Sequence, residues 1–420
     1  MNLRNILSPT VLTGALFASV AMVTPAQAQI ARSASTATTR PVKSQVAPVT
    51  NDAGTTTTAA TSPVGFTTTS CLANTDTNLV IPFTRPPVYV GASTGGANTS
   101  TTVGTISFSG TPFTASAYKY VQNTQSTHYY AYVTGGTKEG AIYDITDNTA
   151  NSLTINTNGD TVSGIASGTQ VRIVPHWTLG TAFTVGQSVI GSPSFSGASS
   201  TQILLPDQST VGTDLAAGAI YYYYTGTAAG GAGWRKNGAA VATIYNDTIL
   251  YPETYFVLRN NTANATSFVP VGSVSTLSAA VTSGSTQTIA VNIATVLDTL
   301  QANTDQDNAV ALPVAVDTTL SGSNLYQSGA FAGSPSFSGT GDQVLVYDNT
   351  VAGTDKAATK IYYYYTGTAA GGAGWRKQGD AVATLHNSDL LPAGVGFVVR
   401  KRGTTTPQTL VWNYRPIIAP

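Results

Sequence analysis

Two runs of four tyrosines, Tyr221–Tyr224 and Tyr362–Tyr365, are the residues most suggestive of a binding surface. In a strand, alternate side chains share a face, so each run directs two rings to either side. Trp234 and Trp375 follow on the next expected strands. A face that stacks on sugars would consist of Tyr221, Tyr223, Trp234, Tyr362, Tyr364 and Trp375. The alternative, which we favour, is that these rings pack inside the protein, because aromatic residues are common in strands.

A glycine-rich segment, Ala228–Gly233, follows the first run and returns as Ala369–Gly374. A phosphate cradle needs such glycines between a strand and a helix, with Lys and Ser or Thr behind them. Here Trp-Arg-Lys follows in a β context, which predicts a hairpin loop. We expect the Arg-Lys pairs, Arg235-Lys236 and Arg376-Lys377, to be solvated.

Metal ligands are sparse. The three histidines, His128, His176 and His386, are isolated, and no zinc-site spacing occurs. Asp305 and Asp307 offer oxygens on alternate residues, as in a calcium loop, but the glycine and distal glutamate of an EF-hand are missing. The sequence therefore predicts no cofactor and leaves calcium binding by these aspartates open.

Catalytic groups are also few. The only glutamates are Glu139 and Glu253, and no G-x-S-x-G segment is present. Cys71 is the only cysteine, so it forms no intramolecular disulfide, and we expect a lone thiol whose role stays open. These observations predict that the protein is not an enzyme.

Charged residues make up 9% of the 420 residues, against about 25% in typical domains. Lys and Arg number 19, as do Asp and Glu, so the formal net charge is zero. Without a basic excess the chain is poorly suited to neutralise phosphates, which argues against a nucleic-acid partner.

The N-terminus predicts export. Arg4 precedes an apolar run over Val11–Val23, and Ala26-Gln27-Ala28 matches a signal-peptidase site. We therefore expect a signal peptide over 1–28 and no transmembrane helix in the mature chain. Residues 29–64, rich in Thr, Ala, Ser and Pro, predict a disordered spacer.

The chain contains an internal repeat. Ile220–Lys236 returns without change as Ile361–Lys377, and Gly191–Gly197 returns as Gly333–Gly339. Short β-rich runs bounded by turn residues, among them Ala117–Val121 and Tyr129–Val133, predict an all-β fold of antiparallel, sandwich-like domains. The expected divisions are an N-terminal β domain at 65–178, module copies at 179–272 and 321–420, and a connecting segment at 273–320.

Six strands are expected in the first copy: Gln202–Leu205, Ile220–Thr225, Gly233–Lys236, Ala240–Tyr245, Tyr255–Asn260 and Ser267–Val271. Asn237-Gly238 predicts a hairpin turn between two of them. In the connecting segment, Ala294–Gln301 predicts a short helical turn.

Several segments carry a resemblance: Asp76–Pro87, Val174–Leu179, the two Gly-Trp-Arg-Lys-x-Gly stretches and Gly396–Arg400. Over about residues 65–420 the chain resembles a family of uncharacterised, multi-copy, exported β-rich proteins of Gram-negative bacteria. The resemblance implies export and supplies no activity, catalytic residue or ligand.

Together these features predict an exported, non-catalytic structural or adhesive protein that presents one contact surface twice. The alternative is a carbohydrate-binding protein using the duplicated Tyr/Trp strands, and an outer-membrane barrel ranks third. Expected partners are extracellular glycans or other surface proteins. The location (extracellular, cell surface or periplasm) and the oligomeric state stay open.

Overall fold

The computed structural model describes residues 64–274, 288–289, 293–414 and 417–418. The expected signal peptide, and the expected spacer up to residue 63, lie outside the described residues. The described chain is almost entirely β and is built from several antiparallel sheets, as the sequence predicted. None of its helices is long and apolar enough to cross a membrane.

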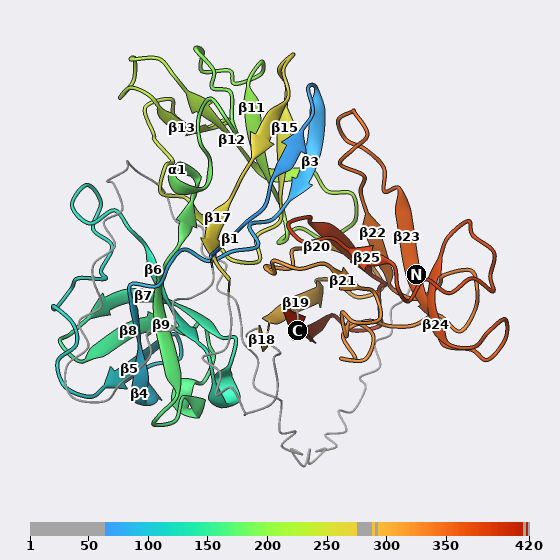
Figure 1. The fold of residues 1–420 in the computed structure, drawn as a ribbon, viewed down its shortest axis with the longest axis horizontal. Helices are drawn as coiled ribbons and strands as arrows, with labels where there is room; N and C mark the ends of the chain where they lie inside the picture. The colour runs from blue at the N-terminus through green and yellow to red at the C-terminus, as the bar shows by residue number, and fades with distance from the viewer. Residues whose placement is uncertain (1–63, 275–287, 290–292, 415–416, 419–420) are drawn as a thin grey trace, which may run out of the picture.

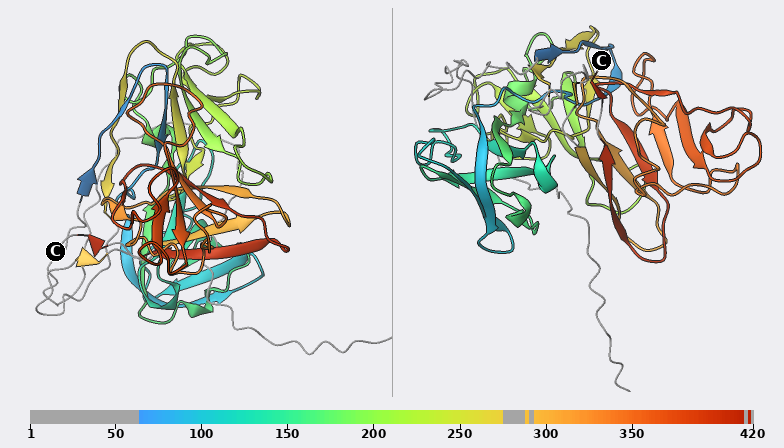
Figure 2. Two further views of the ribbon diagram at one scale, coloured as in Figure 1. Left: turned by 90° about the vertical axis from the view of Figure 1, so that its right-hand side faces the viewer. Right: turned by 60° about the horizontal axis from the view of Figure 1, so that its bottom comes forward.

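Figure 1 shows three bodies, and in the right-hand view of Figure 2 the first repeat sheet lies between the other two. One body is a closed barrel with the strand order β4-β5-β8-β7-β6-β9. Its strands are β4 (Tyr89–Asn98), β5 (Val103–Phe108), β6 (Tyr129–Val133), β7 (Ile142–Asn148), β8 (Ser152–Asn156) and β9 (Gln170–Pro175). Short 3₁₀ turns, η1 (Gly136–Lys138) and η2 (Val162–Gly164), connect its strands.

Strands β5 and β8 alternate buried and half-buried residues along their length, which lets one face turn toward the inside of the barrel. Ile106, Leu153, Ile155 and Val171 are fully buried in its core. The sequence predicted β6 with its observed bounds, but 117–121, also expected as a strand, forms turns.

We call the second body the first module. It contains β1 (Val64–Phe66), β2 (Thr69–Cys71), β3 (Thr75–Leu79), β10 (Trp177–Thr178), α1 (Leu179–Ala182), β11 (Thr201–Pro206), β12 (Ala217–Tyr224), β13 (Gly233–Lys236), β14 (Ile249–Leu250), β15 (Phe256–Asn260), β16 (Thr266–Phe268) and β17 (Val271–Ser273). Its main sheet has the order β13-β12-β11-β15-β3.

We call the third body the second module. It contains β18 (Thr288–Ile289), β19 (Ile293–Thr299), β20 (Gln306–Val310), β21 (Thr318–Thr319), β22 (Gln343–Val346), β23 (Lys360–Tyr365), β24 (Gly374–Lys377), β25 (Leu390–Leu391), β26 (Phe397–Lys401), β27 (Gln408–Tyr414) and β28 (Ile417–Ile418). Its main sheet runs β24-β23-β22-β26-β20, the order of the corresponding strands in the first module.

The barrel is inserted into the first module. Strand β3 precedes the barrel in sequence, yet it pairs with β15, as β20 pairs with β26 in the second module. The boundaries therefore differ from those expected. The segment 65–178 contains β1–β3 of the first module besides the barrel, and 273–320 contains β19 and β20 of the second.

Two further local expectations, both outside the barrel, were wrong. Residues 240–245 form turns and loop rather than a strand, and they contact β13 through a backbone hydrogen bond from the Tyr245 amide to the Trp234 carbonyl. Residues 294–299, expected as a helical turn, belong to β19, which pairs with β27 along its whole length. In β19 a distant backbone partner, β27, overrides the local preference.

Candidate functional site

The residues of the expected sugar-stacking face lie mainly inside the modules. Trp234 and Trp375 are 1% and 0% exposed, and Tyr221 and Tyr362 are also buried. Tyr223 and Tyr364 are half-buried, and the face of Tyr364 stacks on Tyr326 with ring centroids 3.6 Å apart. The expectation that the tryptophans fill the cores is confirmed.

The outward-facing tyrosines of each run are covered as well. Phe195 stacks on Tyr224, and Phe337 stacks on Tyr365, each with centroids 4.1 Å apart. These phenylalanines come from the two copies of the Gly-Ser-Pro-Ser-Phe-Ser-Gly segment. The repeated aromatic residues are therefore used in packing.

The expectation that the Arg-Lys pairs are solvated was wrong for both arginines, since Arg235 and Arg376 are each 1% exposed. The Arg235 guanidinium donates to four carbonyl oxygens: Val241 at 2.7 Å, Trp234 at 3.3 Å, Ala229 at 3.1 Å and Gly231 at 2.7 Å. Arg376 makes the equivalent four bonds. Each arginine thus holds the neighbouring glycine-rich loop in place.

Asp305 and Asp307 are each bound to an arginine, Asp305 to Arg402 and Asp307 to Arg400. In the described part of the chain, no group of three or more His, Cys, Asp and Glu side chains is placed to hold a metal ion. Cys71 is fully buried in the first module's core, and this burial raises the pKa of its thiol.

The two modules are fastened by reciprocal loops. The first-module loop 207–216 lies along β20, where the Asp307 amide donates to the Gly212 carbonyl over 3.0 Å. The second-module loop 347–359 lies along β3, where the Asp76 amide donates to the Gly353 carbonyl over 2.9 Å. The contacts are therefore related by an approximate twofold axis.

Each loop carries an aspartate that binds an arginine of the opposite module, and that arginine also binds an aspartate of its own module. Arg259 forms a forked pair with Asp76, with both N–O distances 2.7 Å, and also binds Asp355 of the opposite loop. Arg400 does the same with Asp307, at 2.7 and 2.9 Å, and with Asp214 of the opposite loop at 2.9 Å. These bonds to Asp76 and Asp307 raise the pKa values of Arg259 and Arg400, respectively, above their ordinary range.

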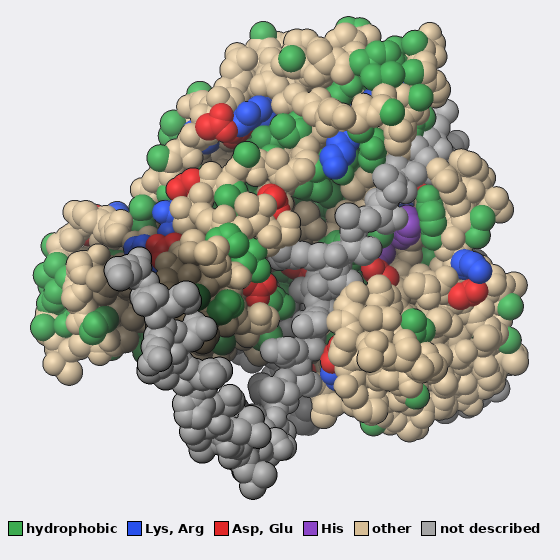
Figure 3. Space-filling model, turned by 180° about the vertical axis from the view of Figure 1, so that it is seen from behind, with side chains coloured by type: hydrophobic (Ala, Val, Ile, Leu, Met, Phe, Trp, Pro, Cys, Tyr) green, Lys and Arg blue, Asp and Glu red, His purple; other side chains and the backbone are tan. Residues whose placement is uncertain are grey.

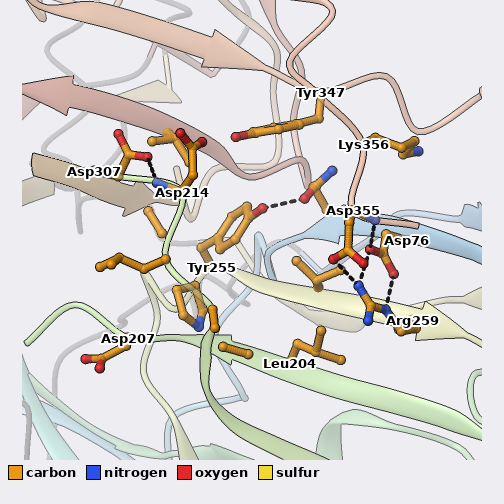
Figure 4. A pocket seen from close by; sticks show the side chains of 18 of the residues that line it. Asp76, Leu204, Asp207, Asp214, Tyr255, Arg259, Asp307, Tyr347, Asp355 and Lys356 are labelled. Carbon is orange, nitrogen blue, oxygen red and sulfur yellow. Dashed lines mark hydrogen bonds and ion pairs between the residues drawn. The ribbon is translucent and has the colours of Figure 1, made fainter. Parts of the chain in front are cut away.

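A cavity of about 270 Å³ lies between the modules (Figure 4). Both loops and the outer faces of both sheets line it. Its apolar surface includes Leu204, Val257 and Val398, and its polar surface includes five aspartates, Asp76, Asp207, Asp214, Asp307 and Asp355.

Two tyrosines break the symmetry of the cavity. Tyr255 lies beside the axis, and its hydroxyl donates to the Asn78 side chain. The corresponding residue of the second module is Gly396, where an added Cβ would lie 1.9 Å from the Tyr255 ring. Only one of these two positions can hold a ring. Tyr347 projects over the other side of the cavity, where the first module has Pro206.

The surroundings of Asp207 and Tyr347 shift the pKa values of both side chains. Hydrogen bonds from Thr210 and Ser209 lower the pKa of Asp207 to about 2, so this carboxylate is ionised near neutral pH. Burial, with Asp307 and Asp214 nearby, raises the pKa of Tyr347 to about 12, so its phenol is neutral.

The chain matches no protein-family model, no curated protein and no solved structure. The functional conclusions below therefore rest on the residues and the geometry of this chain.

A second polar cluster lies where the barrel meets the first module. Asp144 accepts hydrogen bonds from His176 Nε2 and from the Tyr251 hydroxyl, each at 2.9 Å. His128, which the sequence had suggested was isolated, lies beside His176, and its ring stacks on Tyr120. Burial and the nearby His176 lower the pKa of His128 to about 4. This cluster joins the barrel to the module.

Sequence reasoning missed the cavity. One usable signal was the similarity of the two loops, since Gly212-Thr-Asp214 returns as Gly353-Thr-Asp355. The arginine partners, Arg259 and Arg400, occupy equivalent positions in the two copies of the repeat. Their pairing with residues 183 and 93 positions away has no local signature.

Proposed function

We propose that the protein is an exported, non-catalytic structural or adhesive protein that acts at the cell surface or outside the cell. The observation that carries this proposal is how the repeated residues are used. The duplicated Tyr, Trp, Phe and Arg side chains fill cores and hold loops, and the duplicated pairs Arg259–Asp355 and Arg400–Asp214 fasten the modules together.

Such an arrangement suits a rigid spacer, or a scaffold that presents its outer loops to a partner. Two modules fastened at both ends of their contact hold their outer loops at a defined separation, which favours simultaneous engagement of two sites. The surface carries few charges, and Figure 3 shows them as separate spots on one face. The expected signal peptide and the resemblance to exported proteins support a location beyond the inner membrane.

Fractionation of the source cells tests the location. We expect the protein in the medium or on protease-accessible cell surfaces, with a mature N-terminus at Gln29. A matched variant, Ala28→Asp, should block cleavage and hold back the longer chain. Recovery of the uncleaved wild-type chain in the cytoplasm would overturn the proposal.

The adhesive role is tested by binding of the purified mature chain to intact cells and to glycan-coated surfaces. For an adhesive protein we expect saturable attachment of the mature chain to these surfaces. Variants that each lack one surface charge should attach equally well. The carbohydrate alternative through the duplicated Tyr/Trp strands has no observation in its favour, because four of its six rings are buried.

A further inference from the structure

The cavity between the modules has an excess of negative charge. Five carboxylates line it, and the cations within or beside it are Arg259, Arg400 and Lys356. The groups around the cavity therefore carry two more formal negative charges than positive charges. The fully formed Asp207 carboxylate belongs to this excess, since its hydrogen-bond partners are neutral hydroxyl and amide groups.

The three cations are already engaged. Arg259 and Arg400 bind their two aspartates each. The Lys356 ammonium donates to the carbonyl oxygens of Asp348 and Val351 in its own loop, at 2.7 and 2.9 Å. Four of the five carboxylates are therefore paired with a guanidinium, and Asp207 is the carboxylate that an incoming cation would meet without displacing an arginine.

Aromatic and apolar surface completes the cavity. The rings of Tyr255 and Tyr347 lie on two sides of it, as Figure 4 shows. The face of a tyrosine ring attracts a cation, and it does so more strongly where water is excluded. Leu204, Val257 and Val398 offer surface for an alkyl chain.

The size and donor arrangement select an organic cation over a metal ion. The volume of about 270 Å³ suits a small ligand, such as a short chain with a charged head. Among the described residues no set of acidic side chains converges to hold a metal ion. A neutral sugar would gain nothing from the excess charge.

We propose that this cavity binds a small alkylammonium ligand, with the ammonium beside the carboxylates and tyrosine rings and the chain on the apolar surface. The same chemistry is available from a free diamine and from a lysine side chain of a partner protein. The proposal concerns a binding site and is independent of where the protein is located.

Titration of the mature full-length chain, followed by calorimetry and ligand-observed NMR, tests the site with four probes. These are 1,5-diaminopentane, Nα-acetyl-lysine amide, its neutral analogue Nα-acetyl-norleucine amide, and glucose. We expect saturable binding of one or both amines and none of the neutral probes. Binding of the diamine alone identifies a free amine as the ligand, and binding of both admits a lysine side chain. Equal binding of a neutral probe, or no saturable binding of either amine, would overturn the proposal.

The chain offers a matched pair of variants. Asp207 and Asp348 occupy equivalent turns and are both held by neighbouring hydroxyl groups, but only Asp207 lines the cavity. Asp207→Asn should weaken amine binding about fivefold through loss of one charge, and Asp348→Asn should leave it unchanged. Equal effects of the two variants would contradict the placement of the ligand.

Tyr347 provides the second test. Its hydroxyl has no hydrogen-bond partner among the described residues, so Tyr347→Phe should keep the ring and the affinity. Tyr347→Leu should weaken amine binding about fivefold. Near-UV circular dichroism and melting temperature establish that each variant is folded, and a folded Tyr347→Leu with unchanged affinity would contradict the proposed cation–ring contact.

Discussion

At the scale of single residues, Arg235 and Arg376 differ most from the sequence-based prediction, because both are buried where solvent exposure was expected. Exposed Arg-Lys pairs are common, so the sequence favoured solvent for both. The planar guanidinium instead places its donors on carbonyl oxygens of a loop whose Ala229, Gly230 and Gly231 all have positive φ. Burial of the neighbouring Trp234 could be predicted from its type; the loop's need for a buried donor could not.

Arg235→Lys should lower the free energy of unfolding by about 2 kcal/mol, because lysine cannot reproduce the fork and leaves buried carbonyls unpaired. Urea unfolding followed by tryptophan fluorescence measures this. Hydrogen exchange should also accelerate at 228–233. Lys236→Arg, one residue along and half-buried, is the control. An equal, small effect of both variants would show that the loop does not need the guanidinium.

His128 should make stability depend on pH. Its pKa is about 4 in the folded protein, below the ordinary 6.5, so the unfolded chain binds a proton first as pH falls. Stability is therefore lost between pH 6.5 and 4, by about 2 kcal/mol at pH 5 relative to pH 7.5. Comparing urea midpoints of wild type and His128→Phe at both pH values isolates this contribution. A wild-type loss no greater than that of the variant would refute it.

At the scale of elements, strands with strong local signals were predicted and strands defined by distant partners were not. Strands β6 and β13 were expected with their observed bounds. Strands β3 and β20 were missed as members of the modules, because Thr75–Leu79 and Gln306–Val310 are polar and find their place only by pairing with β15 and β26. Pairing between strands so far apart in the chain produces no periodic pattern of apolar residues that the sequence could reveal.

Gly396, just before β26, is the element-scale position most sensitive to substitution. In Gly396→Ala the new Cβ would overlap the Tyr255 ring, so the modules must shift, at about 1–3 kcal/mol. Combining it with Tyr255→Ala should cost less than the sum of the single changes. Differential scanning calorimetry of the three variants measures this, and strict additivity would show that the two residues do not meet.

At the scale of the whole molecule, the modules are joined by a few well-placed groups of unequal strength. Within the first module, Asp76 and Arg259 are 8% and 20% exposed and form a forked pair, whereas Asp355, which reaches Arg259 from the second module, is 81% exposed. Forked, shielded pairs contribute more than exposed ones. The shape of the candidate site therefore depends on the two less exposed carboxylates, Asp76 and Asp307. The spacing of these residues in the sequence could not show this.

Asp76→Ala should lower the free energy of unfolding by about 2 kcal/mol, since Arg259 and the Asp355 amide lose a partner. Asp355→Ala should cost less than about 1 kcal/mol. Urea midpoints of the full chain compare them, and the twin pair Asp307→Ala and Asp214→Ala repeats the comparison at the other end. A larger cost for the exposed aspartates would reverse this ranking.

The barrel's insertion between β3 and β10 bears on the order in which the chain folds as it is synthesised. The barrel contains all of its strands within 89–175 and can close as soon as these residues are free. Strand β3 must wait for β15, because Asp76 and Arg259 are 183 residues apart. Pairing over such separations is slow. The second module follows, and the inter-module cavity forms last, only after both loops and β26 have emerged. A chain halted before residue 397 would therefore contain a folded barrel and no cavity.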